Sequence, residues 1–112
     1  MKTEIKEGVL VISPEGNLLS EQGNAGMVEL LKTTFEAGTK KVLFNLSAVQ
    51  FINSTGLGML LTAISKTRNS GGEMALCSVP DQMKKLLQMT KLESVFIVKP
   101  DEASGIAFLK SA

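Results

Sequence analysis

The stretch that decides the fold reads FINSTGLG and occupies residues 51–58. It follows an apolar run at residues 42–46 that is typical of a buried strand, and it leads into an apolar run with helical spacing at residues 57–64. Asn53 and Ser54 are both residue types that cap the amino end of a helix. A strand, a polar turn and a helix start form the kind of place where α/β proteins carry functional groups. We therefore expect a functional site at this turn, where backbone N–H groups and the helix dipole would stabilise an anion such as a phosphate.

Working outward, the hydrophobic pattern predicts a single α/β domain over residues 1–112 with the element order ββαβαβαβα. Strands are expected at Ile5 and at residues 9–12, 40–46, 73–79 and 95–98, and helices at residues 23–37, 54–69, 80–90 and 103–109. Strand–helix–strand units imply right-handed crossovers and a mixed, mainly parallel sheet covered by helices, with an antiparallel strand near one edge.

Local signals set several boundaries in this pattern. A tight turn is expected at residues 7–8, residues 14–17 are expected to end or bulge the second strand, and Ser20 is a candidate cap or loop residue. Gly38 is expected to stop the first helix, and Pro80 is expected at the first position of the third.

Composition excludes several classes of function. Twelve basic and eleven acidic residues give a net charge of +1, so no basic stripe is available for nucleic acid. The chain has no histidine and one cysteine, Cys77, which predicts no metal site, no cofactor and no catalytic activity of its own. Cys77 sits in an apolar run and is expected to be buried. No segment resembles a signal peptide or a membrane span, which favours a cytoplasmic protein without membrane contact.

The motif also carries a family resemblance. Residues 53–58, preceded by Asn-Leu-Ser-x-Val-x-Phe-Ile at residues 45–52, resemble the signature of the STAS domain of bacterial anti-sigma factor antagonists. The usual form there is Asp-Ser-Ser/Thr-Gly-Leu/Ile-Gly. The likeness extends to residues 71–77 and 83–96 and covers nearly the whole chain. It implies a small mixed sheet covered by helices, which agrees with the order predicted from the pattern.

The resemblance implies a phosphorylation switch. In that family an unphosphorylated antagonist binds an anti-sigma factor that is also a serine kinase, phosphorylation of the motif serine breaks the complex, and a serine phosphatase resets it. Ser54 matches the phosphorylated position, and Thr55 is the alternative acceptor. The expected partner surface is the turn and the loop beside it, comprising Leu19, Asn53, Ser54, Thr55, Gly56, Leu57 and Gly58.

Two departures from the family pattern keep another reading open. Asn53 replaces the acidic residue before the serine, and Leu19 replaces an acidic residue of the earlier loop. If those carboxylates help a kinase to orient the serine, the chain is instead an unswitched STAS scaffold subunit of a sensory or lipid-transport complex. A third reading is that residues 53–55 are only a helix cap.

Overall fold

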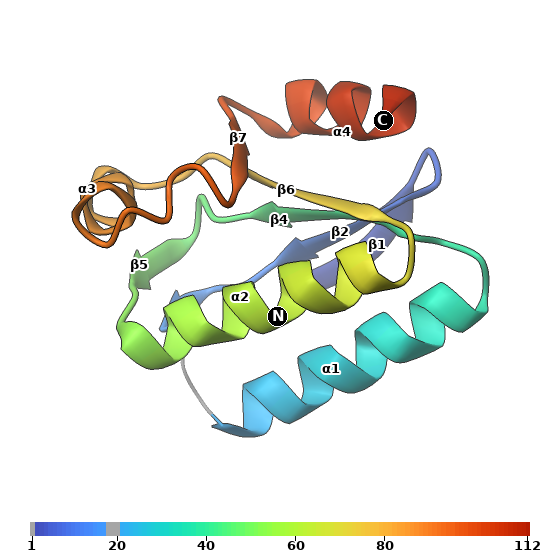
Figure 1. Ribbon diagram of the computed structural model, residues 1–112, viewed down its shortest axis with the longest axis horizontal. Coiled ribbons are helices and arrows are strands. Elements are labelled where there is room, and N and C mark those ends of the chain that lie inside the picture. Colours follow the sequence, from blue (N-terminus) through green and yellow to red (C-terminus); the bar gives the residue numbers. More distant parts are fainter. Residues whose placement is uncertain (1, 18–20) are drawn as a thin grey trace.

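The computed structural model describes residues 2–17 and 21–112, which form a five-stranded sheet with the strand order β1-β2-β4-β6-β7. The edge strand β1 runs antiparallel to β2, and every other pairing in this sheet is parallel. The predicted mixed, mainly parallel sheet is therefore confirmed (Figure 1). The strand bounds are β1 (Lys2–Lys6), β2 (Val9–Ser13), β4 (Lys41–Asn45), β6 (Glu73–Cys77) and β7 (Ile97–Lys99).

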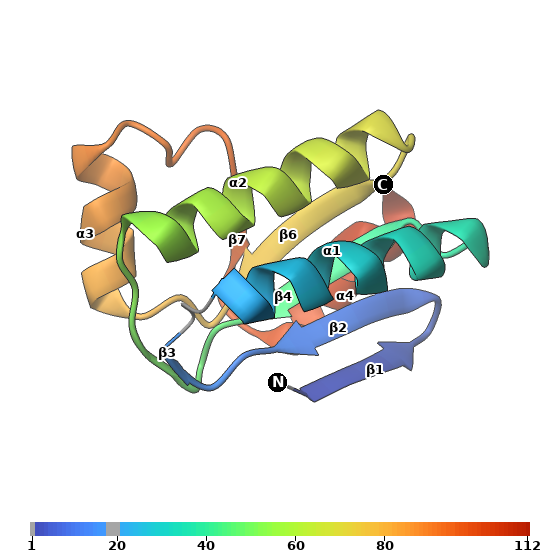
Figure 2. The same ribbon diagram turned by 90° about the horizontal axis from the view of Figure 1, so that it is seen from below.

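Helices cover both faces of this sheet. Helices α1 and α2 lie side by side on one face, α4 lies on the other, and α3 lies near the amino end of α2 (Figures 1 and 2). Their bounds are α1 (Glu21–Glu36), α2 (Ser54–Asn69), α3 (Asp81–Met89) and α4 (Glu102–Ser111). None of the helices in the described ranges has both the length and the apolarity to span a lipid bilayer.

The two cores explain why the central strands are apolar at nearly every position. On β4, Phe44 belongs to the core beneath α1 and α2, whereas its neighbour Leu43 belongs to the core beneath α4. On β6, Leu76 and Cys77 divide in the same way. Successive side chains of a strand point to opposite faces, so a strand covered on both faces needs apolar residues throughout. Cys77 is fully buried, as expected.

The first hairpin has the predicted tight turn. Glu7 and Gly8 join β1 to β2 with φ angles of 53° and 81°. Two consecutive positive φ angles are typical of the two-residue turn that matches the twist of paired strands. The antiparallel edge of the sheet is thus set by residues 7–8.

Two short strands were not predicted from the sequence pattern. β3 (Gly16–Asn17) and β5 (Val49–Phe51) pair in parallel as a separate two-stranded sheet. β2 ends at Ser13, so residues 14–17 end the second strand as predicted, and the last two of them also form β3. Runs of two and three residues are too short to show a period of two.

Three further boundaries differ from the expected ones or cannot be compared. Pro80 is the capping residue before α3 rather than its first helical residue. The last strand is centred on Val98 and is shorter and later than predicted. Ser20, the candidate cap before α1, lies outside the described residues.

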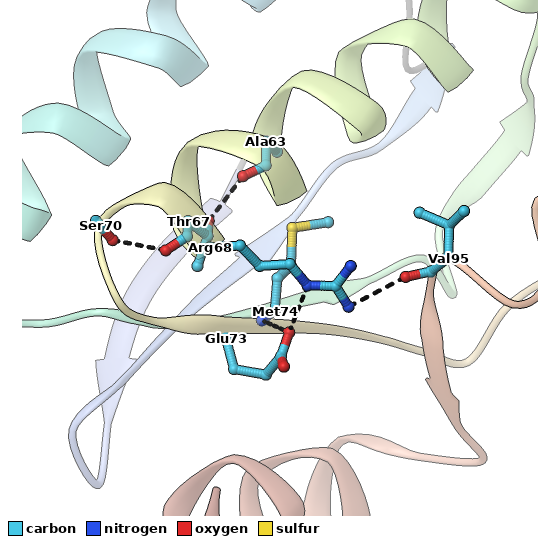
Figure 3. Close-up of polar contacts among 7 residues, drawn as sticks. All are labelled: Ala63, Thr67, Arg68, Ser70, Glu73, Met74 and Val95. Atoms are coloured by element: carbon cyan, nitrogen blue, oxygen red, sulfur yellow. Dashed lines mark hydrogen bonds and ion pairs between the residues drawn. The ribbon is translucent and has the colours of Figure 1, made fainter.

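The carboxyl end of α2 is held to the sheet by polar contacts (Figure 3). Arg68 Nε donates to Glu73 Oε1 at 3.2 Å, and Arg68 Nη2 donates to the backbone oxygen of Val95 at 3.2 Å. A Cβ atom at Gly72 would overlap the carbonyl oxygen of Lys40, so the turn into β6 requires glycine there. These contacts join the carboxyl end of α2 to β6 and to the segment before β7.

Candidate functional site

The amino end of α2 is capped by Asn53. Its backbone is extended, with φ −119° and ψ −172°, and its Oδ1 accepts hydrogen bonds from the N–H groups of Thr55 at 2.8 Å and Gly56 at 3.1 Å. The N–H of Leu57 donates to the backbone oxygen of Asn53 at 3.0 Å and closes the first turn. Of the two candidate caps in the sequence, Asn53 has this role and Ser54 does not.

Ser54 is the first residue of α2 and its side chain is exposed. Among the residues whose side chains the structure describes, none forms a hydrogen bond with the Ser54 hydroxyl. Thr55 is exposed in the same way. The helix start therefore presents two hydroxyl groups to solvent and uses neither of them to cap the helix.

The remaining residues of the motif divide between surface and core. The Leu57 side chain is 7% exposed and packs in the core beneath α2. It is therefore not available to a partner, contrary to the prediction that it belongs to the partner surface. Gly56 is buried, and Gly58 is half-buried with open space where a Cβ would stand. The accessible part of the motif consists of the side chains of residues 53–55 and the uncovered backbone at Gly58.

The pairing of β3 with β5 brings a second segment to this site. Gly16 pairs with Val49 and Asn17 with Phe51, so residues 16–17 lie beside the strand that ends two residues before Asn53. The 16–19 loop was predicted to lie beside the helix start, and the backbone of residues 16–17 does so. Leu19, the expected apolar anchor, lies outside the described residues.

The helix start offers an anion fewer free hydrogen-bond donors than the sequence predicted. Asn53 already occupies the N–H groups of Thr55 and Gly56, which would otherwise be free donors. The first turn of α2 holds no acidic residue, so a negative charge on Ser54 meets no like charge within that turn. The helix dipole still contributes about half a positive charge at this end.

The STAS domain family model matches residues 1–105, nearly the whole chain. The chain belongs to the STAS domain family. Among its relatives is the anti-sigma F factor antagonist of Paenibacillus polymyxa, 24% identical over 110 residues that cover 98% of this chain and 94% of the relative.

Solved STAS structures share the fold. The Thermotoga maritima protein TM1081 superposes with a TM-score of 0.87 at 21% identity, covering 98% of this chain and 88% of that one. The anti-sigma factor antagonist SpoIIAA in its unphosphorylated form gives a TM-score of 0.73 at 17% identity, covering 95% and 93%. The Bacillus protein in its phosphorylated form gives 0.71 at 19% identity, covering 92% and 94%. The relatives and solved structures similar to this STAS domain include several anti-sigma factor antagonists, which are regulatory proteins without enzymatic activity.

Two titratable groups outside this site, Glu102 and Cys77, have structural roles. Glu102 accepts hydrogen bonds from Lys6 Nζ at 2.7 Å and from Asn45 Nδ2 at 3.2 Å, and these bonds lower the pKa of its carboxyl group. Burial raises the pKa of the Cys77 thiol to about 11, so the thiol is not a reactive nucleophile near neutral pH. Within the described ranges, no three acidic or cysteine side chains gather where they could hold a metal ion.

The contact between Asn45 and Glu102 could not be predicted from any motif or periodicity in the sequence. Asn45 closes β4, and its Oδ1 also accepts from the N–H of Ser47 at 3.1 Å. An aspartate at this position would face the carboxylate of Glu102. The amide of Asn45 can donate to that carboxylate, which explains asparagine here in physical terms.

Proposed function

We propose that this STAS domain is a cytoplasmic anti-sigma factor antagonist switched by phosphorylation of Ser54. The unphosphorylated chain binds an anti-sigma factor that is also a serine kinase, and phosphorylated chain is released and later reset by a serine phosphatase. The observation that carries the proposal is that Asn53 caps α2 while the Ser54 hydroxyl stands exposed beside it. A residue that is not needed for the fold can be modified without unfolding it.

The chemistry requires the partner to supply the catalytic groups. Ser54 Oγ attacks the γ-phosphorus of ATP, an O–P bond forms, the bond to ADP breaks, and the hydroxyl proton passes to a base of the kinase. This chain has no histidine, so the base that neutral-pH catalysis most often uses is not available on it. The role of this chain is to present the acceptor hydroxyl on a rigid helix start.

The charge of the phosphate explains why the phosphorylated chain is released from its partner. Phosphorylation adds about 1.5 to 2 negative charges to a surface that was docked against the partner. Desolvation and like-charge conflicts of this kind cost several kcal/mol, and each 1.4 kcal/mol lowers affinity about tenfold. The first turn of α2 contains no acidic residue, so the penalty falls on the complex rather than on the folded chain. SpoIIAA, a relative in fold, has been solved in both an unphosphorylated and a phosphorylated form.

The proposed partner surface comprises the exposed residues 53–55, the uncovered backbone at Gly58 and the adjacent residues 16–17. Asn53 caps α2 as an aspartate would, but it lacks the negative charge of the aspartate that the family pattern has before the serine. If a kinase needs that charge, the chain is an unswitched scaffold subunit that binds a partner through the same surface. The two functions differ in whether a phosphate is ever transferred.

The test is to incubate the chain with ATP and each candidate anti-sigma factor kinase from the same genome, and to locate phosphate by mass spectrometry. We expect phosphate on Ser54 and none on a Ser54→Ala variant that still binds the kinase. Phosphate on Thr55 alone would move the acceptor by one residue. A stable complex with no phosphate on either residue would support the scaffold function instead.

A further inference from the structure

A second concave surface lies between α1 and α2, away from Ser54. The two helices run side by side (Figures 1 and 2), and the groove between their carboxyl-terminal halves has a volume of about 380 Å³. Sites for small ligands span about 300 to 1,000 Å³, so the groove has the size of a small one. Lys66 lies twelve residues beyond Ser54, which places the groove about 18 Å along the helix axis from the phosphorylation site. The lining residues are Val28, Lys32, Phe35, Lys66, Asn69 and Ser70.

The floor of the groove is apolar and anchored. Val28 and Phe35 are both half-buried, and both pack against the main core beneath α1 and α2. Each therefore has a fixed inner side and an outer side that remains open to the groove. Covering that outer side with an apolar group would remove further apolar area from water.

Two lysines stand at the groove from opposite helices. Lys32 comes from α1 and Lys66 from α2, and both are exposed. In the part of the chain that the structure describes, neither lies within ion-pair distance of a carboxylate. Nearby Arg68 differs, since Glu73 and the Val95 backbone oxygen hold its guanidinium (Figure 3).

The carboxylates nearest to Lys32 along α1 lie outside the groove. Glu29 and Glu36 are exposed on α1 but do not line the groove. The carboxyl ends of α1 and α2 each contribute about half a negative charge, which is less in total than two full positive charges. The groove thus combines an apolar floor with two lysines as its charged lining residues.

We propose that this groove binds a free carboxylic acid with an apolar chain, of the medium-chain fatty acid class. The chain lies on Val28 and Phe35, and the carboxylate lies between the ammonium groups of Lys32 and Lys66, with the amide of Asn69 as a further donor. The apolar stems of the lysines cover the sides of the chain. A single molecule can enter the hollow between the two lysines, whereas a flat bilayer would meet the outer surfaces of the helices. For this reason we assign a free acid rather than a membrane lipid.

The test is a titration of the ¹⁵N-labelled chain with decanoate below its micelle concentration, followed by amide chemical shifts. We expect saturable shifts confined to residues 28–35 and 66–70, with residues 53–58 unchanged. Acetate, which lacks the chain, and decyltrimethylammonium, which has the opposite charge, should leave these amides unshifted.

Substitutions locate the site. Two exposed ion pairs contribute about 1 kcal/mol together, so the double variant Lys32→Gln/Lys66→Gln should bind decanoate about fivefold more weakly. The matched double variant Lys84→Gln/Lys85→Gln on α3 has the same net charge and should bind like the unmodified chain.

Three results would overturn the proposal: no saturable shift with decanoate, equal weakening in both double variants, or binding to phosphatidylglycerol vesicles through Lys32 and Lys66 without any response to free decanoate. Because the groove and Ser54 are separate, none of these outcomes depends on whether Ser54 is phosphorylated.

Discussion

Replacing Asn53 and Ser54 by alanine, one at a time, separates the residue that holds the helix from the residue proposed to be modified. In the structure Asn53 Oδ1 accepts from two backbone N–H groups at 2.8 and 3.1 Å. Ser54 makes no such bond in the described part of the chain. Asn53→Ala should therefore lower the free energy of unfolding, whereas Ser54→Ala should leave it nearly unchanged.

The size of the difference follows from capping energetics. Loss of a side-chain cap costs about 1 kcal/mol, within a range of about 0.5 to 2 kcal/mol. A surface substitution that removes no contact changes stability by less than about 0.5 kcal/mol. For a domain of this length, 1 kcal/mol corresponds to a change of about 4 °C in melting temperature. Asn53→Asp keeps the acceptor oxygen and adds a charge that suits a helix amino end, so its stability should equal or slightly exceed that of the unmodified chain.

The assay is urea unfolding monitored by far-ultraviolet circular dichroism, because the chain has no tryptophan or tyrosine for fluorescence. The slope of the unfolding free energy with urea should be the same for all variants, so that midpoints compare directly. Equal destabilisation by Asn53→Ala and Ser54→Ala would refute the reasoning, since the serine would then be needed for the fold.

Three further predictions test other parts of the structure. Gly58→Ala should raise the free energy of unfolding by about 0.5 to 1 kcal/mol, because its Cβ enters open space in a helix. The same substitution should weaken partner binding measured by calorimetry. The control is Gly26→Ala on α1, where the Cβ position is also open, and it should stabilise the chain without affecting binding. Gly72→Ala should destabilise by about 3 kcal/mol or more in urea unfolding, because its Cβ would overlap the Lys40 carbonyl oxygen. The lowered pKa of Glu102 means that its contribution to stability is present above its ordinary value of 4.5 and is lost as the pH falls through its lower value in the folded chain. Glu102→Gln should therefore flatten the acid side of a stability–pH curve, and an unchanged curve would contradict that role.

The long elements of the fold could be predicted from the sequence because both periods are strong there. α2 spans Ser54–Asn69, as expected from its apolar spacing and the glycines beyond it. The apolar runs of β4 and β6 indicated strands covered on both faces, and the two cores confirm this. Long elements repeat their pattern often enough to be distinguished from chance.

The parts that the sequence could not supply depend on contacts between distant residues. The pairing of Gly16 with Val49 joins segments that carry no periodic pattern. The contact of Asn45 with Glu102 joins a strand end to a helix start 57 positions away. At the site, the sequence offered two cap candidates, and only the backbone geometry distinguishes them. Leu57 was expected on the partner surface because it belongs to the motif, but helical spacing turns its side chain into the core.

The most direct test of the central claim is the affinity of the anti-sigma factor kinase for two forms of this chain, measured by isothermal titration calorimetry. One form carries phosphoserine at Ser54, installed during synthesis, and the other is unmodified. We predict that both melt at nearly the same temperature and that the phosphorylated form binds at least about a hundredfold more weakly. Equal affinity of the two forms would contradict the switch.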